Sequence, residues 1–361
     1  MNTPNQIDQI IAKFTSEADT YARMSGAVAH LLSQIISSDH LTVHSITHRC
    51  KEIASLSKKL ARPEKNYQSL AEITDLAGIR VTTYFPKDVD RVARLIEQEF
   101  QIDKNNTIDK RIALDPDKFG YQSLHYIAQL KISRSALIEY KSYEGKKFEI
   151  QVRSILQHAW AEIEHDLGYK SATGIPKEIR RRFARIAGLL EIADDEFEAL
   201  RLKLRNYEQE IKEKNISSLG SLEIDLPSLK AAYASNLAVT ALDRAIAEKA
   251  GAQISVEPSD TLERAAGRLL FLGIKNISQL EQATRENHEL ATNFAAQWID
   301  GKYDKLPMGV GIFYLAYALM AIKKDKSAFL SYLNQFNIGR HEERDNLAER
   351  AISIASRIEA S

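Results

Sequence analysis

Cysteine is nearly absent from this chain, since Cys50 is its one thiol. A single cysteine can form no disulfide within the chain, which excludes a disulfide-stapled scaffold, and it cannot build a zinc site with several cysteine ligands. One free thiol fits a reducing compartment. We therefore expect a cytoplasmic protein whose stability comes from packed cores.

An excess of charge of one sign is also absent, because Lys plus Arg and Asp plus Glu each number 49. This balance does not indicate a protein that binds nucleic acid over its whole surface, although it allows local basic patches. Arg180-Arg181-Arg182 is one such patch. We interpret it as a solvated helix face rather than an RNA contact.

Long hydrophobic runs are scarce too. From Leu306 to Ile322 the chain carries no charge, which is at the short limit for a membrane span. Pro307, Gly309 and Gly311 dilute this stretch, so we expect a buried core helix and no membrane contact. The N-terminus shows no basic region followed by an apolar one, so no signal peptide is expected.

What the chain does contain is enough residues, 361, for two domains with their own cores. Apolar residues at helical spacing from Ile7 to Ile35 predict one long amphipathic helix. We also expect a basic helix from about Ser45 to Arg62, a helix near 87–101 and helical stretches at 154–168 and 177–214. Strand-like runs lie at about 78–85, 108–113, 122–132 and 147–153.

The stretch 215–221 is rich in serine and glycine and is the best linker candidate. We therefore predict a first domain over residues 1–214 and a second over 222–361. The second is patterned as helix throughout and shows no titratable cluster with catalytic spacing. We expect it to be an all-helical regulatory or partner-binding domain.

Two segments about 25 residues apart carry the richest chemistry. The run from Phe119 to Tyr126 offers an aromatic ring, a hydroxyl, an amide and an imidazole just after a glycine. In the second segment Glu149, Gln151 and Arg153 alternate with apolar residues and share one strand face. Three polar side chains are costly to bury without partners, so we expect them to face a polar ligand such as a metal-bound nucleotide.

Two further segments add phosphate and metal chemistry. The predicted basic helix carries a stripe at single-turn spacing that consists of Lys51, Ser55 and Lys59. Together with Arg49, this stripe could hold a polyphosphate. Taken alone, a solvated helix face would explain them better. Asp75 precedes a short turn into an apolar strand, which places a carboxylate at the end of a sheet.

Together and in this order, the four segments resemble the RelA/SpoT alarmone synthetase domain over roughly residues 5–214. R-x-K-x-x-x-S-x-x-x-K stands at Arg49–Lys59, and D-x-A-G-I-R stands at Asp75–Arg80. G-Y-Q-S-L-H stands at Gly120–His125, and E-x-Q-x-R stands at Glu149–Arg153. The last motif runs on into Gln157-His158-Ala159-Trp160-Ala161-Glu162.

The resemblance implies an α+β fold, with a nucleotidyltransferase-like mixed β-sheet flanked by helices. It also implies a reaction, in which a pyrophosphate group moves from ATP to the ribose 3′-hydroxyl of GTP or GDP. The products are AMP and (p)ppGpp, the alarmone of the stringent response. Mg²⁺ is the implied cofactor.

The resemblance assigns roles residue by residue. On the ATP side, Arg49 and Arg80 would sandwich the adenine. The ATP phosphates would be held by Lys51, Ser55 and Lys59. The metal would be held by Asp75 and Glu149, and Glu149 would also be the catalytic base on the 3′-hydroxyl. The acceptor nucleotide would be held by Tyr121, His125, Gln151, Arg153 and Lys118.

One departure concerns the acceptor. Many family members have a lysine four residues before the tyrosine, where this chain has Asp117, followed by Lys118. Lys118 is a possible substitute for that lysine. The alternative is a toxic relative that transfers pyrophosphate to the 3′ end of tRNA or makes adenosine alarmones.

Two other interpretations concern the domains rather than the acceptor. A hydrolase half, found in long family members, would have to lie before residue 40, so we expect a synthetase without one. The second interpretation makes the protein primarily an interaction protein rather than an enzyme. Its C-terminal half would then be a helical sensor of a protein partner or ligand, and the synthetase domain would produce the response. The sequence leaves the oligomeric state open.

Overall fold

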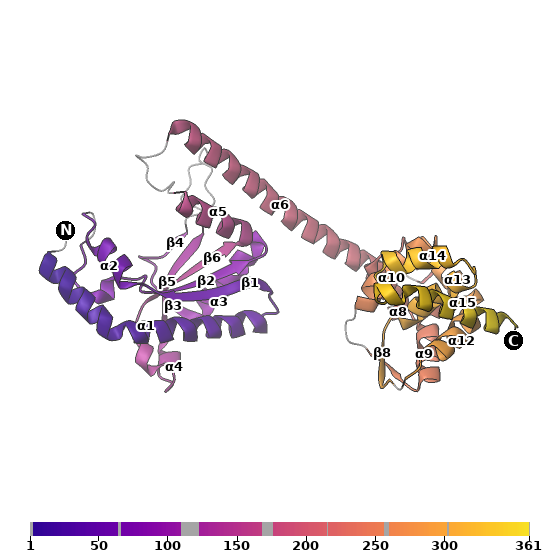
Figure 1. Cartoon of the computed structure of the whole chain (residues 1–361). Coiled ribbons are helices and arrows are strands. Elements are labelled where there is room, and N and C mark those ends of the chain that lie inside the picture. Colours follow the sequence, from indigo (N-terminus) through magenta and orange to yellow (C-terminus); the bar gives the residue numbers. More distant parts are fainter. Residues whose placement is uncertain are drawn as a thin grey trace. The chain divides into compact units, whose positions relative to one another are not determined.

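A computed structural model describes residues 3–63, 66–109, 123–167, 176–214, 216–255, 260–301 and 303–360 of the chain. Contacts between its residues divide the chain into two compact units, Met1–Leu202 and Lys203–Ser361 (Figure 1). The sequence had placed the domain boundary near residue 214. The division falls instead within a long helix, α6 (Lys177–Glu213).

The N-terminal unit contains both helices and strands. They are α1 (Pro4–Ser38), β1 (Val43–Cys50), α2 (Ile53–Leu60), η1 (Leu70–Glu72), β2 (Ala77–Thr83), α3 (Pro86–Glu99), β3 (Phe100–Ile102), β4 (Ile108–Asp109), β5 (Leu124–Leu130), α4 (Ile132–Ser135), η2 (Lys141–Tyr143), β6 (Phe148–Ser154), α5 (Ile155–Asp166) and the first part of α6. The long N-terminal helix, the helix after β2 and strands β2, β5 and β6 agree with the sequence patterns, whereas β1 and β3 were not predicted.

The strands form one mixed sheet in the order β1-β2-β6-β5-β3, and β4 pairs with β5. β2 and β6 run parallel, and every other pair within this sheet is antiparallel. The mixed sheet flanked by helices confirms the predicted α+β class.

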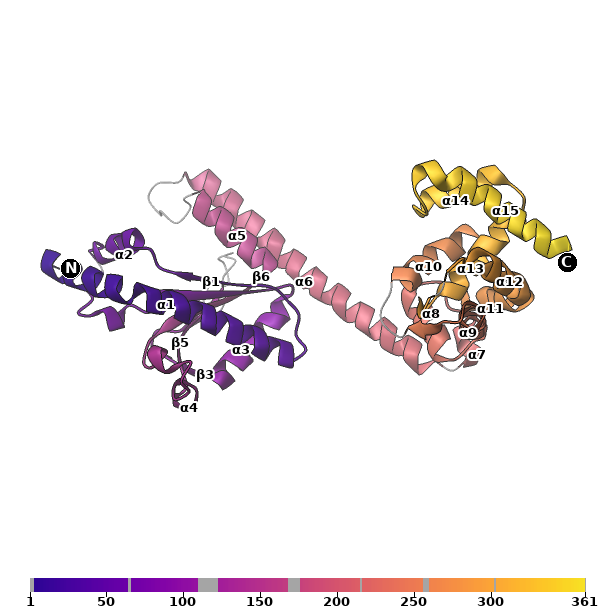
Figure 2. The same ribbon diagram turned by 60° about the horizontal axis from the view of Figure 1, so that its bottom comes forward.

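One face of this sheet is apolar and is covered by α1 and α3, which contact β1, β2 and β6. Figure 2 shows α1 lying along the sheet. Ile79, Val81, Ile150 and Val152 point to this side and are at most 1 % exposed. Because strand residues alternate between faces, the residues between them must point the other way, toward α5. The fold therefore separates a core face from a polar face.

The predicted basic helix from Ser45 to Arg62 is wrong in its first half. Residues up to Cys50 form β1, which pairs with β2 over the whole strand, and only Ile53–Leu60 is helical. Val43, Ile46 and Thr47 are β-branched residues that suit a strand. Hydrogen bonding to β2 makes this segment a strand, because tertiary pairing overrides local propensity.

In the described part of the C-terminal unit, the structure is helical apart from one pair of short parallel strands, which the sequence did not predict. Its elements are α7 (Ile216–Leu219), α8 (Leu226–Ala234), α9 (Ala238–Ala250), β7 (Gln253–Ser255), α10 (Asp260–Phe271), α11 (Ile277–Glu286), α12 (His288–Trp298), β8 (Lys305–Pro307), α13 (Val310–Ala321), α14 (Lys326–Gln335), η3 (His341–Glu343) and α15 (Arg344–Ala360).

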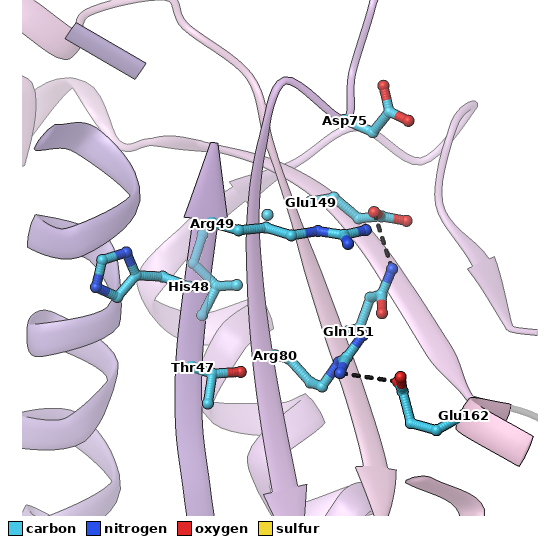
Figure 3. Close-up of a pocket in the computed structure, with 10 residues that line it drawn as sticks. Thr47, His48, Arg49, Asp75, Arg80, Glu149, Gln151 and Glu162 are labelled. Atoms are coloured by element: carbon cyan, nitrogen blue, oxygen red, sulfur yellow. Dashed lines mark hydrogen bonds and ion pairs between the residues drawn. The ribbon is translucent and has the colours of Figure 1, made fainter. Parts of the chain in front are cut away.

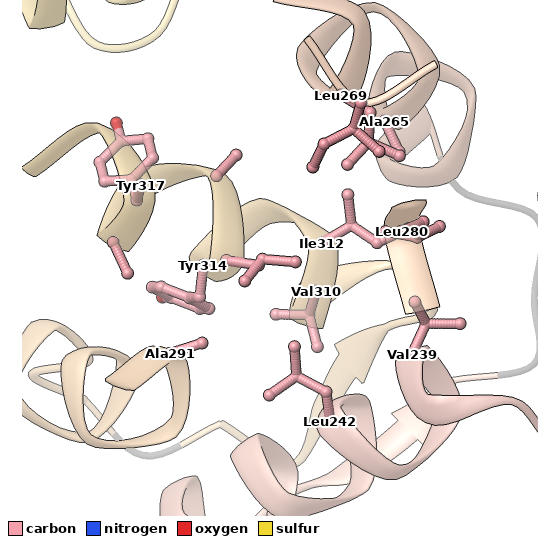
Figure 4. Close-up of a cluster of buried hydrophobic side chains, with 14 of the residues drawn as sticks. Val239, Leu242, Ala265, Leu269, Leu280, Ala291, Val310, Ile312, Tyr314 and Tyr317 are labelled. Carbon is pink, nitrogen blue, oxygen red and sulfur yellow. The ribbon is translucent and has the colours of Figure 1, made fainter. Parts of the chain in front are cut away.

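Helix α13 is the apolar run that the sequence singled out, and it lies at the centre of this core. Ile312, Leu315 and Tyr317 are at most 1 % exposed, and helices α9, α10, α12 and α15 pack around them (Figure 4). The prediction of a buried core helix is confirmed. No helix in the described part of the chain is long and apolar enough to span a bilayer.

The segment predicted to be a linker also belongs to this core. Leu219 is 1 % exposed within it, and Ile211, near the end of α6, is 2 % exposed in the same cluster. The phenol of Tyr207 on α6 donates a hydrogen bond of 2.6 Å to Asp225. The end of α6 is therefore part of the C-terminal unit.

Candidate active site

The register of the sheet brings residues of all four sequence motifs onto neighbouring strands, since His125 of β5 pairs with Gln151 of β6. Arg49 of β1 pairs with Gly78 of β2, and Gly78 pairs with Glu149 of β6. In the next row Arg80 pairs with Gln151. Paired residues share a face, so these side chains project from the polar side of the sheet (Figure 3). Residues far apart in sequence thus form one polar surface.

A cavity of about 170 Å³ opens on this surface. Its lining residues are Thr47, His48, Arg49, Asp75, Gly78, Ile79, Arg80, Glu149, Gln151 and Glu162. The ring of His48 turns away from the cavity toward α1, where Ser25 Oγ lies 3.1 Å from its Nδ1 (Figure 3). Arginines and carboxylates therefore dominate the cavity, which suits a ligand that is both charged and planar.

Asp75 sits in the turn just before β2 and binds both lysines of the predicted phosphate stripe. Lys51 Nζ lies 2.9 Å from one carboxylate oxygen, and Lys59 Nζ lies 2.7 Å from the other. Burial by itself would raise the pKa of Asp75, but the hydrogen bonds and charges of the two lysines outweigh it and hold that pKa below its usual value. Two ammonium groups are thereby held at one edge of the cavity.

Glu149 is fixed at both carboxylate oxygens. Oε1 lies 2.7 Å from Nδ1 of His125, and Oε2 accepts a hydrogen bond of 3.0 Å from the amide of Gln151. The other ring nitrogen of His125 lies 2.7 Å from Ser123 Oγ. Burial would raise the pKa of Glu149, but the contact with His125 and the bond from Gln151 hold it below its usual value. This carboxylate is thus ionised and oriented at neutral pH.

Glu162 on α5 belongs to the segment Gln157–Glu162, and no role was predicted for it from the sequence. One of its oxygens lies 3.0 Å from Arg80 (Figure 3). The same oxygen lies 3.6 Å from both Arg153 and His158. Three potential cations thus share one carboxylate oxygen. The single signal in the sequence was the position of Glu162 on a helix that follows directly from β6.

Arg153 is buried, at 3 % exposure, and does not line the cavity. Burial and the nearby charge of Arg80 lower the pKa of Arg153 to about 10. Its guanidinium lies 3.5 Å from Oε1 of Gln151, a residue that is also assigned to the acceptor. It lies 3.6 Å from Glu162, which also contacts Arg80. Burial followed by the charges of Arg153 and Arg80 likewise lowers the pKa of His158.

The predicted metal ligands, Asp75 and Glu149, both line the cavity. Within the described ranges no three His, Cys, Asp or Glu side chains gather as a metal site. Mg²⁺ is commonly bound through one or two carboxylates, with waters and substrate phosphates completing its shell. The two carboxylates therefore fit a cation that arrives with a nucleotide, rather than one held by the protein alone.

Ser55 is a predicted site residue that does not line the cavity. It lies on α2 and is exposed. Lys118 and Tyr121, both assigned to the acceptor, lie outside the described residues. The structure thus describes the cavity with the ATP and metal residues more fully than the acceptor side.

Comparison with known proteins gives a consistent result. The family described as "Region found in RelA / SpoT proteins" matches residues 48–174. The chain is 26 % identical over 186 residues to GTP pyrophosphokinase YjbM of Bacillus subtilis, covering 50 % of this chain and 82 % of that protein. It is 29 % identical over 170 residues to GTP pyrophosphokinase YwaC of the same organism, covering 45 % and 78 %.

Solved structures of similar proteins cover about half of the chain. Small alarmone synthetase 1 from Bacillus subtilis matches with a TM-score of 0.45 at 24 % identity, covering 54 % of this chain and 98 % of that one. A GTP pyrophosphokinase family protein from Streptococcus pneumoniae matches with a TM-score of 0.45 at 26 % identity, covering 54 % and 96 %.

Proposed function

Because this chain is a RelA/SpoT-type pyrophosphotransferase with an additional C-terminal helical region, we propose that it moves a pyrophosphate group from ATP to the ribose 3′-hydroxyl of GTP or GDP. The products are AMP and (p)ppGpp. The observation that carries this proposal is the meeting of Arg49, Asp75, Arg80 and Glu149 around one cavity.

The two arginines supply the adenine site. A guanidinium is planar and stacks on aromatic rings, and base stacking contributes roughly 1–3 kcal/mol per base. Arg49 and Arg80 project from neighbouring strands on the same face of the sheet, with Thr47 paired to Arg80. Glu162 holds Arg80 from α5 at 3.0 Å. This contact limits the freedom of the guanidinium before a base arrives.

The lysines supply charge for the ATP phosphates. Lys51 and Lys59 now share the carboxylate of Asp75, so their ammonium groups already lie beside the cavity. Binding of a triphosphate would exchange this carboxylate for phosphate oxygens as lysine partners. Mg²⁺ bound by Asp75 and Glu149 would neutralise charge on the transferred phosphates.

Glu149 is assigned as the base. Its carboxylate would take the proton of the 3′-hydroxyl while that oxygen forms a bond to the β-phosphorus of ATP. The bond between the β-phosphorus and the oxygen bridging to the α-phosphate breaks, and AMP leaves with that oxygen. A carboxylate that is ionised at neutral pH and held at both oxygens suits this role.

Gln151 and His125 are proposed to bind the acceptor nucleotide. The two residues are paired across β5 and β6. Asp117 stands where many relatives have a lysine for the acceptor phosphates. That replacement favours a second candidate acceptor, an adenosine at the 3′ end of tRNA or in a free nucleotide. The C-terminal unit is proposed to regulate the reaction or to bind a partner.

The test is incubation of the full chain with γ-labelled ATP and one acceptor at a time: GDP, GTP, ATP or total tRNA. We expect label in GDP or GTP, with equal release of AMP, in the presence of Mg²⁺ and none after chelation. Glu149→Gln serves as the inactive control. Label in tRNA or ATP alone would replace the guanine acceptor by the second candidate, and no label in any acceptor would refute the proposal.

A further inference from the structure

One arginine of the C-terminal unit is buried without a partner for its charge. Arg268 on α10 is 5 % exposed, and its Nε and Nη1 are buried without a hydrogen bond to any described residue. Among the described residues, the groups that act on its charge are Tyr332, Tyr317 and Arg264, and none of them is a carboxylate. Burial lowers the pKa of Arg268, which reflects how unfavourable this position is for a cation.

A second buried arginine of the same unit shows the usual arrangement. Arg344 at the start of α15 is 9 % exposed, and its guanidinium donates hydrogen bonds to the side chains of Asn334 and Asn337 and to two backbone carbonyls. Arg268 instead lies over the ring of Phe313, with its central carbon 4.9 Å from the ring centroid. A cation–π contact offsets part of the cost of burying the charge, but it leaves the N–H groups unsatisfied.

A second buried polar group without a partner lies beside this arginine. Tyr332 on α14 is fully buried, and its hydroxyl makes no hydrogen bond to any residue that the structure describes. The electrostatic interaction between Tyr332 and Arg268 marks the two groups as neighbours. Both can donate a hydrogen bond, so one acceptor would satisfy them together. A water molecule would leave the positive charge uncompensated, whereas an anion would neutralise it.

Half-buried aromatic rings lie around these two side chains. They belong to Phe271 of α10, Phe313 of α13 and Phe336, which follows α14. The rings of Phe271 and Phe336 pack at 80° to one another, with their centroids 5.9 Å apart. Gly267 is exposed beside them, and a Cβ there would lie 3.2 Å from the Phe336 ring. A ligand that approaches the guanidinium therefore meets apolar ring surface, which favours a planar apolar body over a bare ion.

We propose that Arg268 and Tyr332 form a binding site for a small organic anion. The carboxylate or phosphate oxygens of this ligand would accept hydrogen bonds from both side chains, and its planar body would pack on the surrounding rings. We call this place the anion site. It lies wholly within the C-terminal unit, so the proposal stands whether or not the transfer reaction is as proposed above. Because a ligand that binds only the folded state stabilises it, the anion should stabilise this unit.

The first test follows thermal unfolding of the full chain in a Trp160→Phe background, where the fluorescence of Trp298 reports on the C-terminal unit. Benzoate and phenyl phosphate are the probes, at constant ionic strength, and benzyl alcohol is their uncharged counterpart. We expect at least one of the two anions to raise the unfolding midpoint increasingly with its concentration, and benzyl alcohol to have no effect. The head group that acts distinguishes a carboxylate ligand from a phosphate ligand. A midpoint that neither anion moves would overturn the proposal.

Substitutions separate the anion site from other cationic sites of the chain. Arg268→Met should raise the Kd of the active probe, measured by calorimetry, at least about tenfold, because a hydrogen bond to a charged group contributes that much. Arg285→Met, at an arginine on α11 whose side chain is 74 % exposed, is the matched control and should leave that Kd unchanged. Arg49→Met, in the cavity of the N-terminal unit, should leave it unchanged as well. Equal affinity for the native chain and for Arg268→Met would place the probe elsewhere and refute the assignment.

The sign of the stability change distinguishes a binding site from an arginine that serves packing alone. In a buffer without organic anions, Arg268→Met should unfold at the same temperature as the native chain or higher, because it removes an unpaired buried charge. With the active probe present, the native chain should be the more stable of the two. Tyr332→Phe, which removes a hydroxyl without a partner, should keep the midpoint and weaken binding of the probe. Lower midpoints for both variants without the probe would show that the two groups stabilise the fold by themselves, against the proposal.

Discussion

The ring nitrogen Nδ1 of His125 lies 2.7 Å from Oε1 of Glu149. Family resemblance had assigned His125 to the phosphates of the acceptor. We propose that it also positions the base, because its ring contacts one oxygen of the Glu149 carboxylate. Ser123 Oγ holds the far side of the same ring, and Gln151 holds the other carboxylate oxygen. The base is thus positioned by His125 of β5 and Gln151 of β6, with Ser123, just before β5, holding the histidine ring.

Glu149→Gln should reduce transfer by roughly 10²–10⁴-fold, because an amide cannot accept the proton of the 3′-hydroxyl. Affinity for ATP should change little, since Arg49, Lys51 and Lys59 remain. Turnover is measured by AMP release and ATP affinity by calorimetry. Glu139→Gln, an exposed glutamate on another segment, is the control. Turnover above about a tenth of the native value would remove Glu149 from the role of base.

His125→Ala should lower kcat by about 10–100-fold, the usual effect of removing a side chain that orients a reacting group. The KM for the acceptor should move much less than kcat. His125→Asn, whose amide can still donate to Glu149, should recover part of the loss. Steady-state kinetics with the acceptor varied separates the two roles. A rise in acceptor KM at unchanged kcat would show that His125 binds phosphates and does not position the base.

Asp243→Asn should destabilise the C-terminal unit by about 1–3 kcal/mol, since it spoils a buried acceptor. The Asp243 carboxylate accepts hydrogen bonds from the backbone of Gly309 at 2.8 Å and Gly311 at 2.6 Å, and from the Tyr233 phenol at 3.1 Å. An amide nitrogen in place of one oxygen would face a backbone N–H. Denaturation in a Trp160→Phe background, where Trp298 is the remaining tryptophan, reports on this unit. An unchanged denaturation midpoint would show that the hydrogen bonds to Asp243 do not stabilise this unit.

The same residue predicts a pH dependence. Burial raises the pKa of Asp243 to about 6, against the hydrogen bonds that lower it. The folded state therefore holds this proton more tightly than the unfolded chain, whose aspartate titrates near 3.8. The free energy of unfolding of this unit should fall as pH rises from about 4 to about 6 and then level off. Asp243→Asn should remove that slope, and its persistence would assign the slope to another group.

Truncation of the chain after Leu202 should leave the candidate active site intact while removing the C-terminal unit. A cut at Ser218, which the sequence alone would suggest, should give a less soluble product, because Tyr207 and Ile211 would lose the core that covers them. Basal transfer rates and cellular toxicity of both truncations are compared with those of the full chain. Identical rates and toxicity for the chain that ends at Leu202 and for the full chain would argue against a regulatory C-terminal unit.

Several features follow from local sequence alone. The alternation of Glu149, Gln151 and Arg153 with Ile150 and Val152 determines which face of β6 is polar, because side chains alternate along any strand. The uncharged stretch at α13 determines a buried helix, and helical periodicity gives the extent of α1 and α6. Each of these signals is contained in neighbouring residues, so no knowledge of the rest of the chain is needed.

The active site itself was decided by tertiary structure. Residues 45–50 read as helix in isolation and form β1 because β2 supplies their hydrogen-bond partners. Pairing with β2 places Arg49 beside Gly78 and, across it, Glu149, rather than on one helix with Lys59 as the sequence predicted. The sharing of Asp75 by two lysines, and of Glu162 by Arg80, Arg153 and His158, depends on packing between elements distant in sequence. Periodicity specifies which face of an element is polar, whereas strand register specifies which polar faces meet.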